Sequence, residues 1–293
     1  MSGEGLTFAR HGRFRSCSKK VVFVTVLPMG KLTRTRTRGN GHGAATPPAV
    51  LFDSLRTRAE LAAQPRPRGV RGPPLRHFLG ELEVLKEPWR RARGTLKVAP
   101  AAEPRVVMLL PGFGTHPVRM RHMAKKLEAA GHTVKRWGLG FNLGPSQESF
   151  ERLNARVLEL HRRYGEKVWL VGWSLGGIFA REIAKRNPEL VAKVVTMGSP
   201  FSGDGRANNV WRIYHLITGH SVDNPPVGAN RAQKPPVPTV ALWSPRDGLV
   251  HTRAACGKPG ERDRAVALRC THLGFAYSDE AIAAVLRELE REG

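Results

Sequence analysis

The amino-acid sequence predicts an α/β fold in which a mostly parallel sheet carries helices on both faces. From residue 105 onward, short apolar runs alternate with longer segments whose apolar residues recur at helical spacing. That alternation is typical of a parallel sheet covered by its connecting helices. The chain has 293 residues, 41% of them hydrophobic, which is enough for one such domain with a large core and a tail besides.

Strands are expected where a short apolar run ends in turn-forming residues. In chain order they cover residues 106–110, 133–137, 167–171, 191–197, 239–243 and 266–270. The first run leads into Pro111-Gly-Phe-Gly114, and the fifth leads into Ser244-Pro-Arg-Asp-Gly248. Proline, glycine and aspartate at these points favour tight turns at the end of each strand.

Helices are expected in the segments between these strands. Residues 75–84 predict a helix that leads into the domain, and residues 175–186 predict one directly after the third strand. A terminal helix begins at Ser278, a preferred N-cap residue, with two acidic residues in its first turn. Three helices have an apolar inner face. The helix between the first and second strands has Met120, Met123, Leu127 and Ala130 on this face, and the helix between the second and third strands has Phe150, Leu153, Val157 and Leu160. The terminal helix has Ile282, Val285, Leu286 and Leu289.

Residues 1–75 form a low-complexity, arginine-rich segment that differs from the rest of the chain. Repeats of Thr-Arg, Gly and Pro-Arg cannot bury a core, so we expect a disordered tail here, with an isolated helix over 52–63 as the exception. Residues 76–293 are then the domain. Residues 200–237 break the alternation and predict a small cap inserted into it.

The tail is about a quarter of the chain but carries +11 of the formal net charge of +24, because its 14 Lys and Arg face three Asp and Glu. One interpretation is binding to nucleic acid or to an anionic membrane. The other is compositional bias, since Arg, Ala, Gly and Pro are enriched together. We favour the second because no aromatic residues interleave with the basic ones as a base-stacking surface requires, and so we expect no nucleic-acid partner.

The sequence also indicates where the protein is located and whether its cysteines form disulfides. No segment approaches the roughly 20 apolar residues of a transmembrane helix. Residues 21–27 follow two lysines but lack a cleavage site, so a cytoplasmic location is expected, with export as the alternative. The three cysteines (Cys17, Cys256 and Cys270) do not make a disulfide scaffold. We expect Cys256 and Cys270 to be reduced, and a bridge between them is the alternative.

The segment Gly172-Trp173-Ser174-Leu175-Gly176 predicts a nucleophilic serine. It has the pattern G-x-S-x-G and lies between an apolar strand and a helix, where a sharp turn lifts the serine hydroxyl clear of the backbone. The two glycines are needed because the turn leaves no room for side chains. The flanking strand and helix make the pattern more specific than the five residues alone.

A serine hydroxyl needs a base, and the base needs an orienting acid. Asp247, in the turn after the fifth strand, is the expected acid, although Asp204 after the fourth strand is a rival. His272, after the sixth strand, is the expected base, with His251 as a competitor. The chain order Ser, Asp, His is one of the arrangements in which this triad occurs.

The oxyanion formed in acyl transfer needs two backbone N–H donors. We expect them from Leu175, which follows the nucleophile, and from Phe113, in the loop after the first strand. The nearby His116 is expected to be solvated.

Residues 104–290 resemble the α/β-hydrolase superfamily and, within it, bacterial lipase- and esterase-like members. The matching segments are Leu110-Pro-Gly-Phe-Gly114, Gly140-Phe-Asn-Leu-Gly144, Gly172-Trp-Ser-Leu-Gly-Gly177, Gly198-Ser-Pro200, Ser244-Pro-Arg-Asp-Gly248 and Thr271-His-Leu-Gly274. The resemblance implies a triad of Ser174, Asp247 and His272 and the oxyanion donors Phe113 and Leu175. It also implies a serine ester hydrolase that needs neither metal nor cofactor.

Substrate contacts are expected from the residue before the nucleophile and from the cap. The residues expected to line the site are Trp173, Trp211, Ile213, Tyr214, Leu216 and Ile217, the alternative for the cap residues being a short helix packed at the sheet edge. Many lipases have His-Gly where Pro111-Gly112 stands here. That difference and the small cap favour small to medium esters. Thioester cleavage or acyl transfer by the same triad is the alternative within enzymes, and a basic binding protein is the alternative outside them.

Overall fold

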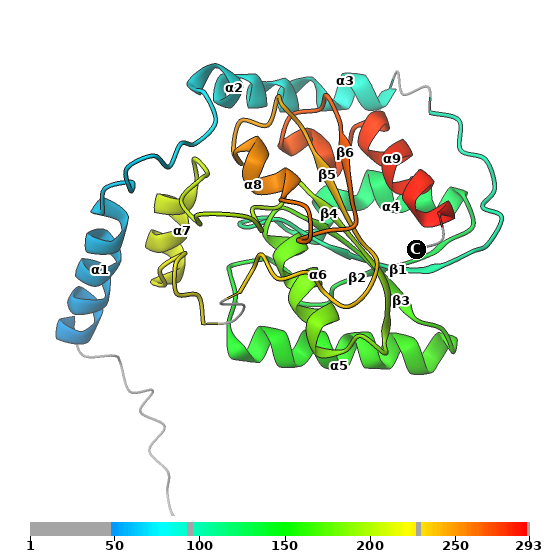
Figure 1. Cartoon of the computed structure of the whole chain (residues 1–293), viewed down its shortest axis with the longest axis horizontal. Coiled ribbons are helices and arrows are strands. Elements are labelled where there is room, and N and C mark those ends of the chain that lie inside the picture. The colour runs from blue at the N-terminus through cyan, green and yellow to red at the C-terminus, as the bar shows by residue number, and fades with distance from the viewer. Residues whose placement is uncertain (1–47, 93–95, 227–229, 292–293) are drawn as a thin grey trace, which may run out of the picture. The chain divides into compact units, whose positions relative to one another are not determined.

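Six parallel strands form one sheet at the centre of the computed structural model, which describes residues 48–92, 96–226 and 230–291 (Figure 1). The strand order is β2-β1-β3-β4-β5-β6. The strands are β1 (Val106–Leu110), β2 (Thr133–Arg136), β3 (Val168–Trp173), β4 (Val191–Met197), β5 (Thr239–Trp243) and β6 (Arg264–Ala267). All neighbouring pairs are parallel, so the carboxyl ends of β1, β3, β4, β5 and β6 meet at one edge of the sheet.

Helices cover both faces of this sheet, with α4 and α9 on one side and α5 and α6 on the other (Figure 1). Among the described residues the α-helices are α1 (Pro48–Ala63), α2 (Leu75–Gly80), α3 (Glu87–Ala92), α4 (Arg121–Ala129), α5 (Gln147–Tyr164), α6 (Leu175–Arg186), α7 (Trp211–Thr218), α8 (Thr252–Cys256) and α9 (Asp279–Glu290). Short 3₁₀ helices are η1 (Glu81–Lys86), η2 (Pro117–Met120) and η3 (Leu273–Ala276). The predicted fold class is confirmed.

The core explains why the strand sequences are apolar throughout. Alternate residues of a strand point to opposite faces, and both faces here are buried. Along β1, Val107 and Leu109 pack with the helices α4 and α9, whereas Val106, Met108 and Leu110 pack with α5 and α6. All five side chains are at most 4% exposed. Period-2 alternation is therefore absent from β1, although the segment is a strand.

The sequence prediction missed two helices and misplaced one strand. The helices α3 and α8 were not expected, and β6 covers Arg264–Ala267 instead of 266–270. This strand lies at the edge of the sheet, pairs only with β5, and has no fully buried residue. Its composition is therefore less apolar than that of a central strand. Leu268 was expected in this strand because it is apolar, but it follows the end of β6 and packs in the core.

Part of the expected tail is helical and contacts the predicted cap. In α1, the carbonyl of Ala62 accepts a hydrogen bond from Arg212 Nε of α7 at 3.0 Å. His215 Nδ1 lies 2.9 Å from the carbonyl oxygen of Leu61, and its Nε2 accepts from the Val222 backbone. Of the disordered tail predicted over residues 1–75, the part over residues 1–47 lies outside the described residues, as does Cys17.

Two further sequence expectations concern thiols and membrane spans. Cys256 and Cys270 are both free, as expected. Within the described ranges, every helix is too short or too polar to cross a bilayer.

Candidate active site

Ser174 occupies the turn between β3 and α6, at the carboxyl edge of the sheet. Its backbone has φ 53° and ψ −121°, and among the described residues other than glycine it alone has a positive φ. Such a conformation costs on the order of 1–3 kcal/mol and persists only where the surroundings enforce it. Here the Ser174 N–H donates to the carbonyl of Met197 on β4 at 2.8 Å, which ties the turn to the neighbouring strand.

The glycines on either side of the turn are required by close backbone approaches. A Cβ atom on Gly172 would lie 2.4 Å from the carbonyl oxygen of Gly176, and one on Gly176 would lie 2.2 Å from that of Leu110. Real Cβ atoms essentially never approach backbone atoms so closely. The start of α6 therefore packs directly on β1 and β3, and the predicted strand, turn and helix are present.

The predicted acid and base lie next to each other. His272 Nδ1 lies 2.7 Å from Asp247 Oδ2, and the two side chains are 3% and 0% exposed. A hydrogen bond to an ionised partner at this distance is among the strong ones in proteins. It fixes the orientation of the imidazole ring and makes Nδ1 the donor, which leaves Nε2 as the ring nitrogen that can accept a proton.

Asp247 also fixes its own turn. Its Oδ1 accepts hydrogen bonds from the backbone N–H groups of Leu249 and Val250 at 2.9 and 2.7 Å. The rivals lie elsewhere. Asp204 accepts from the backbone of Arg206, and His251 caps the start of α8 through Nδ1. The fold therefore pairs His272 with Asp247, whereas Asp204 and His251 make local hydrogen bonds elsewhere.

Trp173 links His272 to the serine turn. Its indole Nε1–H donates to the carbonyl oxygen of His272 at 3.0 Å, and the two ring centroids are 5.8 Å apart. The base is thereby packed against the residue that precedes Ser174. In the part of the chain that the structure describes, the Ser174 hydroxyl makes no hydrogen bond of its own to protein.

The pKa of His272 is raised above its ordinary value by its charged neighbours. Burial alone would lower this pKa, but the charge of Asp247, its hydrogen bond to Nδ1 and the charge of Glu81 together outweigh burial. The imidazolium that forms when His272 accepts a proton is thus stabilised in place.

Glu81 is a residue of this site that the sequence analysis missed. It lies in η1, before the first strand, and is 6% exposed. Its Oε1 accepts from the backbone N–H groups of Gly248 and His272, both at 2.8 Å, and its Oε2 accepts from that of Leu273 at 2.9 Å. One carboxylate therefore joins the loop of the acid to the loop of the base. No local sequence pattern marks it, because its partners are far away along the chain.

The loop after β1 lies against the serine turn, as an oxyanion loop should. A Cβ atom on Gly112 would lie 3.4 Å from Ser174 Cβ, so the two backbones are close. Among the described residues, nothing accepts a hydrogen bond from the Phe113 N–H, so this donor has no protein partner there. His116 instead caps η2, accepting from the Val118 backbone.

Asn142 holds this loop in place. The side chain is fully buried, and its Nδ2 donates to the carbonyl of Pro111 at 2.7 Å. Its own carbonyl accepts from the Gly114 N–H at 2.7 Å, and its N–H donates to Thr115 at 3.0 Å. Both sides of Phe113 are thereby hydrogen-bonded to one residue.

A cavity of about 80 Å³ opens beside Ser174 and Leu175. Phe113, Trp211 and Tyr214 line it, and the Phe113 and Tyr214 rings are 5.3 Å apart. The helix α7 therefore covers this cavity, as the cap interpretation required. The other predicted contacts lie outside the lining. Trp173 is buried behind His272, whereas Ile213, Leu216 and Ile217 are 52%, 46% and 43% exposed. They lie on the outer side of α7.

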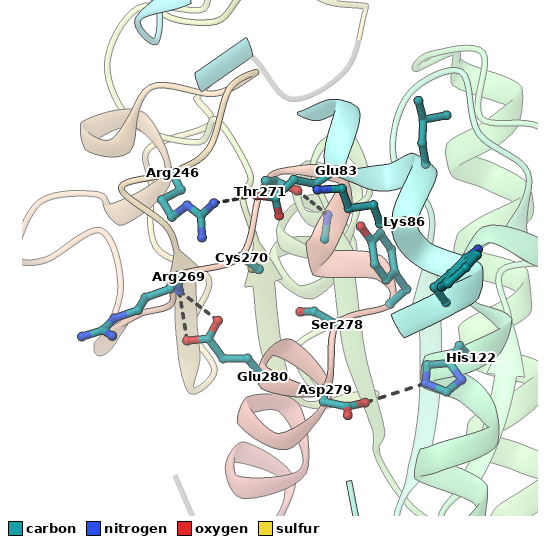
Figure 2. A pocket seen from close by; sticks show the side chains of 14 residues that line it. Glu83, Lys86, His122, Arg246, Arg269, Cys270, Thr271, Ser278, Asp279 and Glu280 are labelled. Atoms are coloured by element: carbon teal, nitrogen blue, oxygen red, sulfur yellow. Dashed lines mark hydrogen bonds and ion pairs between the residues drawn. The ribbon is translucent and has the colours of Figure 1, made fainter. Parts of the chain in front are cut away.

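A second and larger cavity, of about 820 Å³, lies next to the segment that contains His272, since Thr271 and Gly274 are among its lining residues (Figure 2). It is bounded by η1 and α3 and by residues 269–280, and the Arg246–Glu83 ion pair of 2.8 Å lies at its rim. Neither Ser174 nor Leu175 lines it, whereas both line the smaller cavity.

Comparisons with known proteins agree with this geometry. Residues 105–216 match the family model of the alpha/beta hydrolase fold. The chain is 32% identical over 108 residues to a pimeloyl-[acyl-carrier protein] methyl ester esterase of Vibrio parahaemolyticus, covering 36% of this chain and 40% of that protein. It is 41% identical over 68 residues to the enzyme of the same name from Klebsiella pneumoniae, covering 23% and 25%. The matched part is thus two fifths or less of these relatives.

The crystal structure of the mature Bacillus licheniformis lipase BlEst2 is similar with a TM-score of 0.49 and 14% identity, over 66% of this chain and 96% of that one. The family match spans the loop after β1, the serine turn and the start of the cap. Residues 105–216 are therefore similar to the alpha/beta hydrolase fold, and the parallel six-stranded sheet with a serine between β3 and α6 agrees with that similarity.

Proposed function

We propose that the protein is a serine carboxylic ester hydrolase that acts on small to medium esters. The observation that carries the proposal is the buried 2.7 Å hydrogen bond between His272 Nδ1 and Asp247 Oδ2, on loops at the same sheet edge as Ser174. An orienting acid on the base and a serine in a strained turn are what an activated serine nucleophile requires. The matched relatives are named as methyl ester esterases, which favours esters as the substrate class.

In the proposed mechanism, Ser174 Oγ attacks the ester carbonyl while His272 Nε2 takes its proton. The N–H groups of Phe113 and Leu175 hold the oxyanion of the tetrahedral intermediate. His272 returns the proton to the alcohol, which leaves, and an acyl-enzyme remains on Ser174. Water then attacks this ester, again with His272 as base, and releases the acid. Asp247 stays ionised throughout and stabilises the imidazolium.

The test is hydrolysis of p-nitrophenyl butyrate by the wild type and by Ser174→Ala and His272→Ala. We expect each variant to lose at least about 10³-fold in kcat, because the triad members act as a unit. His220→Ala is the matched control, since His220 is an exposed histidine on the cap, and it should keep full activity. A serine-reactive fluorophosphonate should label the wild type on the peptide that contains Ser174.

Activity retained by a folded Ser174→Ala variant would refute the mechanism. A matched thioester and an acceptor alcohol belong in the same panel. If the thioester is cleaved much faster than the ester, or if the acyl group is transferred to the alcohol in preference to water, the triad stands but the ester-hydrolase assignment fails.

A further inference from the structure

Among the described residues that line the cavity beside Ser174, one has a cationic side chain. Arg231, in the segment that returns from the cap to β5, lines the same cavity as Ser174 and Leu175. The other lining side chains include Phe113, Ile178 and Val222, so the wall around the cation is largely apolar. A charged group inside an apolar substrate cavity is costly unless an opposite charge comes to it.

The position of Arg231 is fixed by the protein. Arg181 of α6, only 1% exposed, donates from Nε to the Arg231 carbonyl at 3.3 Å and from Nη2 to the Ala232 and Gln233 carbonyls at 3.1 and 3.0 Å. The guanidinium of Arg231 in turn lies against Gly205, where a Cβ atom would come within 2.9 Å of both of its terminal nitrogens. The backbone of this segment is therefore held, and the head group of Arg231 lies close to the backbone of Gly205.

Arg231 has no carboxylate partner in the described part of the chain. Its guanidinium makes no hydrogen bond there and no ion pair within 4 Å, and the nearest acids, Asp223 and Asp204, act only from farther away. Both acids are already engaged by Arg206, Asp223 through an ion pair of 2.6 Å and Asp204 through a backbone hydrogen bond. Burial lowers the pKa of Arg231, and the two distant acids only partly offset this effect.

We infer that Arg231 is an anion-binding subsite of the acyl cavity, and that the preferred substrates are esters whose acyl chain ends in a carboxylate. These are monoesters of short dicarboxylic acids. The inference rests on the proposed ester hydrolysis. The methylene chain packs against the apolar wall, and the ester carbonyl accepts hydrogen bonds from the oxyanion donors. The guanidinium binds the far carboxylate in a charge-assisted pair. A cavity of about 80 Å³ has room for only a few methylene groups.

The experiment compares monoethyl glutarate with ethyl pentanoate, which has the same acyl length without the charge. Acid release is followed in a pH-stat, and monoethyl succinate and monoethyl adipate bracket the chain length. The wild type should prefer the charged ester, and Arg231→Gln should lower the ratio of the two kcat/KM values by about 10- to 100-fold, the usual worth of a hydrogen bond to a charged group. Arg231→Lys should restore part of the ratio. Arg152→Gln, an exposed arginine on α5, is the matched control and should not change it.

Two results would overturn the inference. One is an unchanged ratio in Arg231→Gln, with both esters slowed alike, which is the signature of a merely structural residue. The other is a wild type that prefers the neutral ester. If the anion were recognised on the alcohol side, the wild type would not prefer monoethyl glutarate over ethyl pentanoate but would favour acetate esters of hydroxy acids. That result would also refute the assignment of Arg231 to the acyl side.

Binding of glutarate itself separates this inference from the proposed function. If the wild type hydrolyses neither ester, the proposed function fails, but the subsite is still tested by the rise in Tm on adding glutarate. We expect that rise in the wild type and in Ser174→Ala, and its loss in Arg231→Gln. An equal rise in Arg231→Gln would show that the anion binds elsewhere and would overturn the subsite.

Discussion

Glu81 Oε1 lies 2.8 Å from the backbone nitrogen of His272 and accepts its hydrogen bond. The same oxygen accepts from Gly248, the residue after Asp247, so a carboxylate from η1 connects the two loops of the proposed acid–base pair. A Cβ atom on Gly248 would come within 2.3 Å of the His77 carbonyl, which shows how closely α2 packs on the acid loop. The segment before β1 therefore supports the loops of the proposed acid and base.

Replacement of Glu81 tests this framework. In Glu81→Gln the amide cannot accept from all three N–H groups, so we expect a loss of stability of about 1.5–3 kcal/mol, as for hydrogen bonds to a charged group, and a fall of about tenfold in kcat. Denaturant unfolding and ester hydrolysis measure the two effects. Glu83→Gln, on the same helix and paired with the half-exposed Arg246, is the control and should cost less than about 1 kcal/mol. Equal behaviour of the two variants would contradict the role of Glu81.

The activity should depend on pH through His272. The base must be neutral to accept the Ser174 proton, and its pKa is raised, so kcat/KM should rise with pH through a midpoint above the ordinary histidine value of about 6.5. Glu81→Gln removes one of the charges that raise this pKa and should move the midpoint down. A midpoint that does not move would show that Glu81 acts only on stability.

The same pKa has a consequence for folding. Because His272 binds its proton more tightly in the folded protein, it contributes stability that is fully present below the unfolded pKa and is lost as pH rises through the folded one. His272→Gln should therefore cost more stability at pH 5.5 than at pH 8.5, as measured by urea unfolding at both pH values. The opposite order would mean that the buried ring is neutral in the folded state at both.

Asn142 should affect turnover more than binding. Asn142→Ala removes the bond to the Pro111 carbonyl that steadies the Phe113 loop, so we expect about a tenfold lower kcat with little change in KM, since the oxyanion forms only in the transition state. Asn187→Ala, at the far end of α6, loses a comparable pair of side-chain hydrogen bonds and is the control. It should lower stability by about 1 kcal/mol and leave kcat unchanged. Equal losses of kcat would refute a specific role for Asn142.

Gly176 should tolerate no side chain. The clash of a Cβ atom with the Leu110 backbone at 2.2 Å cannot be relieved by rotating a side chain, so Gly176→Ala should unfold the protein or lower its Tm strongly. Gly80→Ala is the matched control, because Gly80 has helical φ and ψ of −60° and −23° and no atom within 4 Å of the added Cβ. It should be neutral or stabilise by up to about 1 kcal/mol. A Gly176→Ala protein as stable as the wild type would contradict the close packing of α6 on β1.

The sequence alone determined the features that depend only on residues close together along the chain. The apolar runs of β1, β3, β4 and β5, the helix spacings and the serine turn are local, because each is set by side-chain periodicity or by steric limits within a few residues. The order of Ser174, Asp247 and His272 followed from a pattern of strands and turns. The edge strand β6 was misplaced because only one neighbour buries it.

Only the tertiary structure decided which distant groups meet. Asp247, not Asp204, lies beside His272, and Glu81 reaches it from 191 residues away. Arg231 comes to line the cavity because Arg181 holds the returning segment, and α7 presents Trp211 and Tyr214 to the cavity but Ile217 to its outer side. The periodicity of a sequence does not predict such pairings. They arise from packing between elements that are distant along the chain and meet only when the helices have packed on the sheet.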